Sequence, residues 1–184
     1  HGDPVVYFPT CASRIFGPSD ANTPQQSQVI VELLSRAGYA PILPAQVDQL
    51  CCGQMLSSKG MAEAAEAMAN RLEAALRQAS NNGQYPIVMD ASACSTRMQK
   101  HLAGKLKVYD FHEFAHDALL PRLVIKKQLG PVALHVNCSV KRDTTGTGSE
   151  GKLKALLQAC AEQIIEPAST TCCGFGGDRG FVVP

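Results

Sequence analysis

The chain has 184 residues, 45% of them hydrophobic, with 17 basic and 16 acidic side chains, no tryptophan and eight cysteines. A net charge of +1 without a basic run does not fit a nucleic-acid-binding surface, and no apolar stretch approaches the roughly 20 residues of a membrane span. A chain of this length buries roughly 70% of its unfolded surface on folding. Its core needs no disulfides, so the cysteines require another explanation.

The first part of the chain alternates between short apolar runs and amphipathic segments. This pattern predicts strands at 5–8, 42–43, 87–89 and 107–109, and helices at 25–37, 61–79 and 111–120. Gly38, Asn81-Asn82-Gly83 and Pro121 are the expected ends of these three helices. Strands and helices in alternation predict a parallel sheet covered by helices.

The second part repeats this order, with a strand at 132–136, a helix at 152–163 and a strand at 164–165. The residues from Pro131 to Cys138 align with those from Pro4 to Cys11, and both halves carry a Cys-Cys-Gly sequence. We therefore predict an α/β fold of two pseudo-repeated halves, 1–125 and 126–184, with short parallel sheets flanked by helices. The chain stops directly after a glycine-rich segment, so we expect a piece of a longer protein with a truncated second half.

The cysteines follow the predicted strands. Cys11, Cys94 and Cys138 come directly after strands, and Cys51-Cys52 and Cys172-Cys173 follow the next strand of each half through a loop. Because α/β sheets bind ligands at the carboxyl ends of their strands, we expect these cysteines to gather at that edge. Cys160, inside a predicted helix, is expected to be a small packing residue.

Adjacent cysteines favour an iron–sulfur cluster. Successive side chains of an extended chain point to opposite faces, and structural zinc sites mostly separate their cysteine pairs by two to four residues. A cluster offers several iron atoms to neighbouring thiolates. The glycine after each pair permits positive φ and a close backbone approach to the cluster. Zinc and redox-active or structural thiols remain alternatives, and the cysteine usage favours a reducing, cytoplasmic compartment.

The pattern Cys11, Cys51-Cys52-Gly53, Cys94 resembles the cysteine-rich CCG-domain family of the heterodisulfide reductase B subunit and the glycolate oxidase iron–sulfur subunit. The segments 132–139 and 172–181 look most like the C-terminal part of FAD-linked, iron–sulfur D-lactate dehydrogenases. The resemblance implies a 4Fe-4S-type cluster on the first set of cysteines. It implies a second set, Cys138, Cys172 and Cys173, whose closing cysteine we expect beyond Pro184. Ala91 stands where the family often has a further cysteine.

The resemblance also implies a function, that of an electron-transfer domain without catalytic residues of its own. It would belong to an FAD-linked D-2-hydroxyacid dehydrogenase of the D-lactate or glycolate type, and the fragment alone would be inactive. FAD in another domain would pass electrons through ferredoxin-like domains or subunits and this domain to a quinone or cytochrome. Peripheral association of the full-length protein with the inner face of the membrane is a further expectation. A cluster-based disulfide reductase site and a structural zinc module remain alternatives.

Other motifs receive simpler interpretations. The sequence from Gly146 to Gly151 matches Gly-x-Gly-x-x-Gly but lies too far from the preceding strand for dinucleotide binding, so we expect a loop before a helix. His112 and His116 lack the His-Glu-x-x-His register and are expected to be solvated or core-edge side chains. His135 is expected to be a hydrogen-bonded core residue. The basic residues that follow the cysteines are expected either to offset negative charge near sulfur or to form a solvated face: Arg14, Arg97, Lys141 and Arg142.

Overall fold

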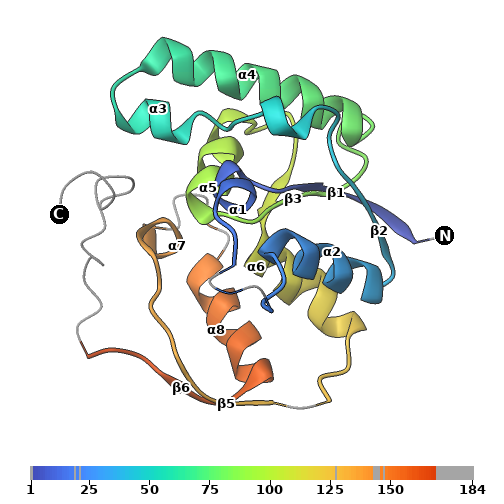
Figure 1. Ribbon diagram of the computed structural model, residues 1–184, viewed down its shortest axis with the longest axis vertical. Helices are drawn as coiled ribbons and strands as arrows, with labels where there is room; N and C mark the ends of the chain where they lie inside the picture. Colours follow the sequence, from blue (N-terminus) through green and yellow to red (C-terminus); the bar gives the residue numbers. More distant parts are fainter. Residues whose placement is uncertain are drawn as a thin grey trace.

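The computed structural model of the protein describes residues 2–18, 20, 22–126, 128–142, 146 and 148–168 (Figure 1). In chain order the elements of the first part are β1 (Asp3–Phe8), α1 (Cys11–Ile15), α2 (Gln26–Arg36), β2 (Tyr39–Ile42), the 3-10 turn η1 (Val47–Gln49), α3 (Gln54–Ser58), α4 (Ala62–Ala79), β3 (Ile87–Met89), α5 (Ser92–His101), β4 (Val108–Asp110), α6 (Phe111–Phe114), the π-helical turn η2 (Ala115–Leu119) and the 3-10 turn η3 (Leu120–Arg122). Those of the second part are β5 (Leu129–Ala133), α7 (Cys138–Arg142), α8 (Ser149–Cys160) and β6 (Ala161–Ile165).

The first four strands form one parallel sheet in the order β2-β1-β3-β4. Alternate residues of a strand face opposite sides, and both sides of β1 are buried here. Val6 and Phe8 pack with α4 and α5, whereas Val5 and Tyr7 pack with α2, α6 and η2. Figure 1 shows this layering, with α4 on one side of the sheet and α2 on the other. Burial on both sides explains why the strands read as apolar runs.

The second part has a two-stranded parallel sheet of β5 and β6. Its order of elements, β5-α7-α8-β6, matches β1-α1-α2-β2, and each series has a five-residue helix that begins at a cysteine. Among the described residues of this part, the buried core cluster is small and consists of Leu134, Val136 and Val140. The second part also packs against the first, because Leu156 of α8 lies against the core that includes Phe114 and Leu119.

The α/β fold class with short parallel sheets is confirmed, although several boundaries differ from the prediction. The helix predicted at 111–120 is divided into α6, η2 and η3, and Pro121 lies inside the last of these turns instead of ending the helix. The strand predicted at 132–136 begins and ends earlier, at Leu129 and Ala133. Cys160 is the last residue of α8 rather than a mid-helix residue. In the described part of the chain, no helix has the length and apolar character needed to cross a membrane.

Candidate metal centre

The first four cysteines lie at the point where the strand order of the large sheet reverses. After β1 the chain goes to β2 on one side and then to β3 on the other, and α/β sheets bind ligands in the crevice at such a point. Cys11 begins α1 three residues after β1, and Cys94 is in the first turn of α5, which follows β3. Cys51 and Cys52 lie between η1 and α3.

The four thiols interact with one another in succession. Cys11 interacts with Cys51, Cys51 with Cys52, and Cys52 with Cys94, closely enough to shift the pKa values of Cys11, Cys51 and Cys52. Cys52 and Cys94 are buried, whereas Cys11 and Cys51 are partly exposed, and all four are free thiols. The chain therefore brings these residues together as expected, while their role as metal ligands stays a prediction.

The interactions between the thiols divide them by acidity. The interaction with Cys11 is the main cause that lowers the pKa of the Cys51 thiol, and the interaction with Cys52, the Gly53 backbone N–H and the charge of Arg14 act in the same direction. The Gly53 nitrogen lies 3.3 Å from the Cys51 sulfur. The interaction with Cys51 in turn raises the pKa of Cys11 and of Cys52, and burial adds to both shifts. Cys51 is thus the preferred thiolate of the set.

Gly53 has a packing role that the sequence analysis did not anticipate. Its φ of +77° confirms that the position needs positive φ. It also approaches helix α4 closely, because a Cβ on Gly53 would lie 2.3 Å from the carbonyl oxygen of Ala65. The glycine lets the Cys-Cys segment turn tightly against α4 and enter α3.

Two polar contacts missed by the sequence analysis join the ends of β1 and β3. Asp90, directly after β3, accepts hydrogen bonds from the Tyr7 hydroxyl at 2.6 Å and from the Thr10 backbone nitrogen at 2.9 Å. Burial, followed by this hydrogen bond, raises the pKa of Tyr7. Because Thr10 precedes Cys11 and Asp90 lies four residues before Cys94, these bonds fix the spacing of the two cysteine-bearing segments.

The donor set fits an iron–sulfur cluster in type and number. Four thiols come from three chain segments. In addition, the Nε atom of Arg14 is buried and has no hydrogen-bond partner among the described residues. The thiols are linked in a row, and in the described residues no three or more His, Cys, Asp or Glu side chains are grouped to hold a metal ion. The adjacent Cys51 and Cys52 suit the separate iron atoms of a cluster better than a zinc site, whose cysteine pairs are mostly two to four residues apart. When bound, a cluster would supply one-electron transfer at this edge.

Only one of the three second-set cysteines lies in the described part of the chain. Cys138 is exposed at the start of α7, whereas Cys172 and Cys173 lie outside the described residues. Cys138 and Ser139 border a cavity of about 540 Å³ that is also lined by Arg97, Lys100 and Arg142. Arg142 is exposed and borders the same cavity as Cys138, so both of its expected roles, offsetting charge near sulfur and forming a solvated face, stay predictions.

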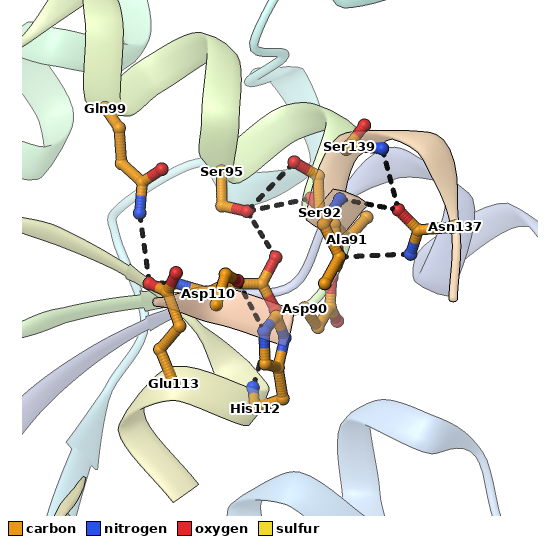
Figure 2. A network of polar contacts seen from close by, with 12 residues as sticks. Asp90, Ala91, Ser92, Ser95, Gln99, Asp110, His112, Glu113, Asn137 and Ser139 are labelled. Atoms are coloured by element: carbon orange, nitrogen blue, oxygen red, sulfur yellow. Dashed lines mark hydrogen bonds and ion pairs between the residues drawn. The ribbon is translucent and has the colours of Figure 1, made fainter. Parts of the chain in front are cut away.

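A polar network connects α5, which carries Cys94, to the second part (Figure 2). Ser95 donates to Asp110 at 2.5 Å, and Asp110 contacts the His112 ring at 2.6 Å. The other ring nitrogen of His112 lies 2.7 Å from the hydroxyl of Ser149, at the start of α8. Figure 2 also shows Asn137, the residue before Cys138, within 3.5 Å of Ser92. None of these contacts was anticipated. Apart from the bond between Asp110 and His112, which are two residues apart, they join residues distant in sequence.

The remaining candidates have structural roles. His112 is buried and bonded to Asp110, while His116 is partly buried and bonded to Asp117, so the two do not form a joint metal site. The expectation of a buried His135 is wrong, because its side chain is exposed between buried Leu134 and Val136. Helix α8 begins at Ser149, inside the glycine motif, which agrees with a loop leading into a helix.

The structure thus defines an α/β protein with a cysteine cluster at the switch point of its sheet. The family model described as "Cysteine-rich domain" (CCG) matches residues 5–99 and 132–182, and the chain belongs to this family. Proteins named "Lactate utilization protein A" from Bacillus thuringiensis (strain Al Hakam) and Bacillus cereus (strain AH187) are each 28% identical to it over 188 residues. Each match covers 94% of this chain and 72% of the relative. No solved structure matches.

Proposed function

We propose that this chain is an iron–sulfur electron-transfer domain of a system that oxidises lactate or a related 2-hydroxyacid. The observation that carries the proposal is the contact of four thiols, from a Cys11, Cys51-Cys52, Cys94 pattern, at the ligand-binding edge of a parallel sheet. Family membership supports a cluster, and the name of the relatives, lactate utilization protein A, supports lactate as the oxidised compound.

In this proposal the protein holds a 4Fe-4S-type cluster on the first set and uses no catalytic side chain. Cys138, Cys172 and Cys173 contribute to a second set. An FAD-linked D-lactate or glycolate-type dehydrogenase domain or subunit carries out the hydride step. Its electrons pass through ferredoxin-like clusters and this domain to a quinone or cytochrome, at the cytoplasmic face of the membrane. The residues of this chain bind the cluster and determine how polar and how buried its surroundings are.

The test is iron and acid-labile sulfide analysis, with EPR, on anaerobically purified full-length protein. We expect Cys51→Ser and Cys94→Ser each to remove about four iron and four sulfide per protein and one EPR signal. Cys160→Ser, at the end of α8, is the matched control and should keep both. Zinc in the wild type without labile sulfide would overturn the cluster assignment. A cluster that D-lactate and the native flavin partner cannot reduce would overturn the link to lactate.

A cluster-based disulfide reductase is a second candidate. The cavity of about 540 Å³ beside the exposed Cys138 favours it, because a substrate disulfide could reach this thiol. Reduced protein would then donate two electrons and two protons would be taken up, so that one disulfide gives two thiols. Oxidation of the reduced clusters by a small disulfide, lost in Cys138→Ser, would favour this candidate over electron transfer alone.

A further inference from the structure

Two arginines occupy the same position relative to two of the cluster cysteines. Arg14 is three residues after Cys11 in α1, and Arg97 is three residues after Cys94 in α5. Residues three apart lie on the same side of a helix. Each arginine therefore extends toward the side of its helix that carries the cysteine.

Both arginines bind the backbone of the Cys-Cys segment. Arg14 donates from Nη1 to the Val47 carbonyl at 2.6 Å and from Nη2 to the Leu50 carbonyl at 2.7 Å. Arg97 donates from Nε to the Cys52 carbonyl at 2.7 Å. These acceptors stand before and after Cys51, in the segment from η1 to the start of α3. The Val47 carbonyl also accepts from the Leu50 backbone nitrogen at 3.1 Å, and the buried Leu50 and Cys52 carbonyls need such donors.

The positive charges of these arginines are shielded from water but only weakly paired. Each side chain is 17% exposed. Their acidic neighbours, Asp48 and Glu66, are 3.7 Å away and are themselves 91% and 56% exposed. Such exposed, long pairs neutralise little charge. The guanidinium of Arg14 also lies 5.8 Å from the ring of buried Phe8, which holds it against β1.

We propose that Arg14 and Arg97 are positioning residues that hold Cys51 and Cys52 in a preformed ligand loop, and that their charge raises the reduction potential of the cluster. The effect on the reduction potential rests on the proposed function, because it requires a bound cluster. A 4Fe-4S cluster with four thiolates is an anion, and nearby positive charge stabilises its more negative, reduced form. The hydrogen bonds that fix the Cys-Cys segment depend on the planar, forked guanidinium group of arginine. A lysine keeps the positive charge but cannot donate to two carbonyls in the same way.

The test compares Arg14→Lys, Arg14→Gln and Arg97→Gln in the full-length protein, with Arg36→Gln as matched control. Arg36 is on α2, 68% exposed and paired with Glu32, so its loss should change nothing. In an EPR-monitored redox titration we expect both cluster-side Gln variants to lower the ratio of reduced to oxidised cluster about tenfold at fixed potential. This corresponds to about 59 mV for a one-electron couple. Arg14→Lys should keep the wild-type potential.

The second readout is amide hydrogen exchange of residues 47–53 in the metal-free protein. We expect about tenfold faster exchange in Arg14→Lys and Arg14→Gln, with the exchange of α4 unchanged, so that a general folding defect is recognised. The inference would be overturned if all the variants kept the wild-type exchange rates of residues 47–53 and the wild-type reduction potential. Absence of labile sulfide in the wild type would instead overturn the proposed function, and the exchange data would still decide whether the arginines hold the loop.

Discussion

At Gly53 the backbone has a φ of +77°, and the carbonyl oxygen of Ala65 lies 2.3 Å from where a Cβ would stand. The segment that carries Cys51 and Cys52 is therefore pressed against the backbone of α4. A side chain at this position must move either α4 or the cysteines. The last residue of the Cys-Cys-Gly motif thus has a packing role that any cluster site here depends on.

We expect Gly53→Ala to lower the free energy of unfolding by at least ~2 kcal/mol, the sum of left-handed strain and overpacking. Urea denaturation of the metal-free protein measures it. Gly60→Ala is the matched control, because Gly60 has a φ of +79° but no atom within 4 Å of its Cβ position. Gly60→Ala should lower the free energy of unfolding by only ~1 kcal/mol, the cost of the left-handed strain alone. Equal losses in the two variants would mean that the contact with Ala65 is unimportant.

The pair of Asp110 and His112 makes stability depend on pH. Burial alone would raise the pKa of Asp110 and lower that of His112, but their mutual hydrogen bond and charges outweigh it and shift both pKa values in the opposite directions. The contribution of Asp110 is present above its ordinary value of 3.8 and is lost as pH falls through its folded pKa. That of His112 is complete below 6.5 and is lost as pH rises through its folded pKa.

We therefore expect His112→Gln to be most destabilising between pH 4 and 6.5, by about 2–3 kcal/mol, the value of a hydrogen bond to a charged group. The difference from wild type should shrink as pH rises above 6.5. Urea denaturation at several pH values measures it. His116→Gln serves as control, since the His116 pair with Asp117 is more exposed and should contribute less than ~1 kcal/mol. A difference that is constant from pH 5 to 9 would contradict the charged pair.

At the scale of elements, helix α7 depends on the residue before it. Five residues are too few for a helix to be stable by itself. The Asn137 side-chain oxygen accepts hydrogen bonds from the backbone nitrogens of Ser139 at 3.0 Å and Val140 at 3.1 Å, and Val140 is buried. The orientation of Cys138 at the start of α7 therefore depends on this cap.

Asn137→Ala should destabilise the protein by ~1 kcal/mol, the usual cost of losing an N-cap. Asn137→Asp keeps the acceptor oxygen and should stay within ~0.5 kcal/mol of the wild type. The comparison uses urea denaturation, with the alkylation rate of Cys138 as a local readout of the helix start. If the alanine and aspartate variants are equally unstable, the amide group rather than the cap is what matters, for example through Ser92.

The elements were predictable where the periodicity is strong, as in α4 and β3, and less so where a segment is half-exposed. Residues 132–136 read as a buried strand, yet β5 is shifted toward the N-terminus and His135 is exposed. The reason is that Leu134 and Val136 alone face the small core, and alternation turns His135 to the other side. The π-helical turn η2 likewise has no signature in its composition.

At the scale of the whole molecule, the meeting of Cys11, Cys51, Cys52 and Cys94 was predictable, because parallel strands end at one edge whatever their side chains. The residues that hold this edge together were not. The carbonyls bound by Arg14 lie in and directly after the short turn η1, where the sequence has no periodic pattern, and the Asp90 contacts depend on the order of strands in the sheet. Spacing along the chain identifies ligand candidates, whereas their supports come from segments that only the fold brings together.

Among the described residues, one buried and two exposed side-chain hydrogen bonds join the two parts of the chain. The buried one links His112 and Ser149 at 2.7 Å, and the exposed ones link Asp117 to Lys152 at 2.5 Å and Asn137 to Ser92 at 3.5 Å. Because the described residues of the second part form a core cluster of three buried side chains, we infer that this part relies on the first for its stability. The buried contact should matter more, since removing the Ser149 hydroxyl deprives the buried His112 ring of its partner.

We expect Ser149→Ala to cost about 1–2 kcal/mol of unfolding free energy and Lys152→Gln less than ~0.5 kcal/mol. In a double-mutant cycle, Ser149→Ala and His112→Gln should couple by about 1 kcal/mol, because each removes the same hydrogen bond. Urea denaturation of the four proteins at pH 6 gives the cycle. Additive losses would mean that the two side chains contribute separately. A single transition in all four would show that the second part unfolds together with the first, as its small core requires.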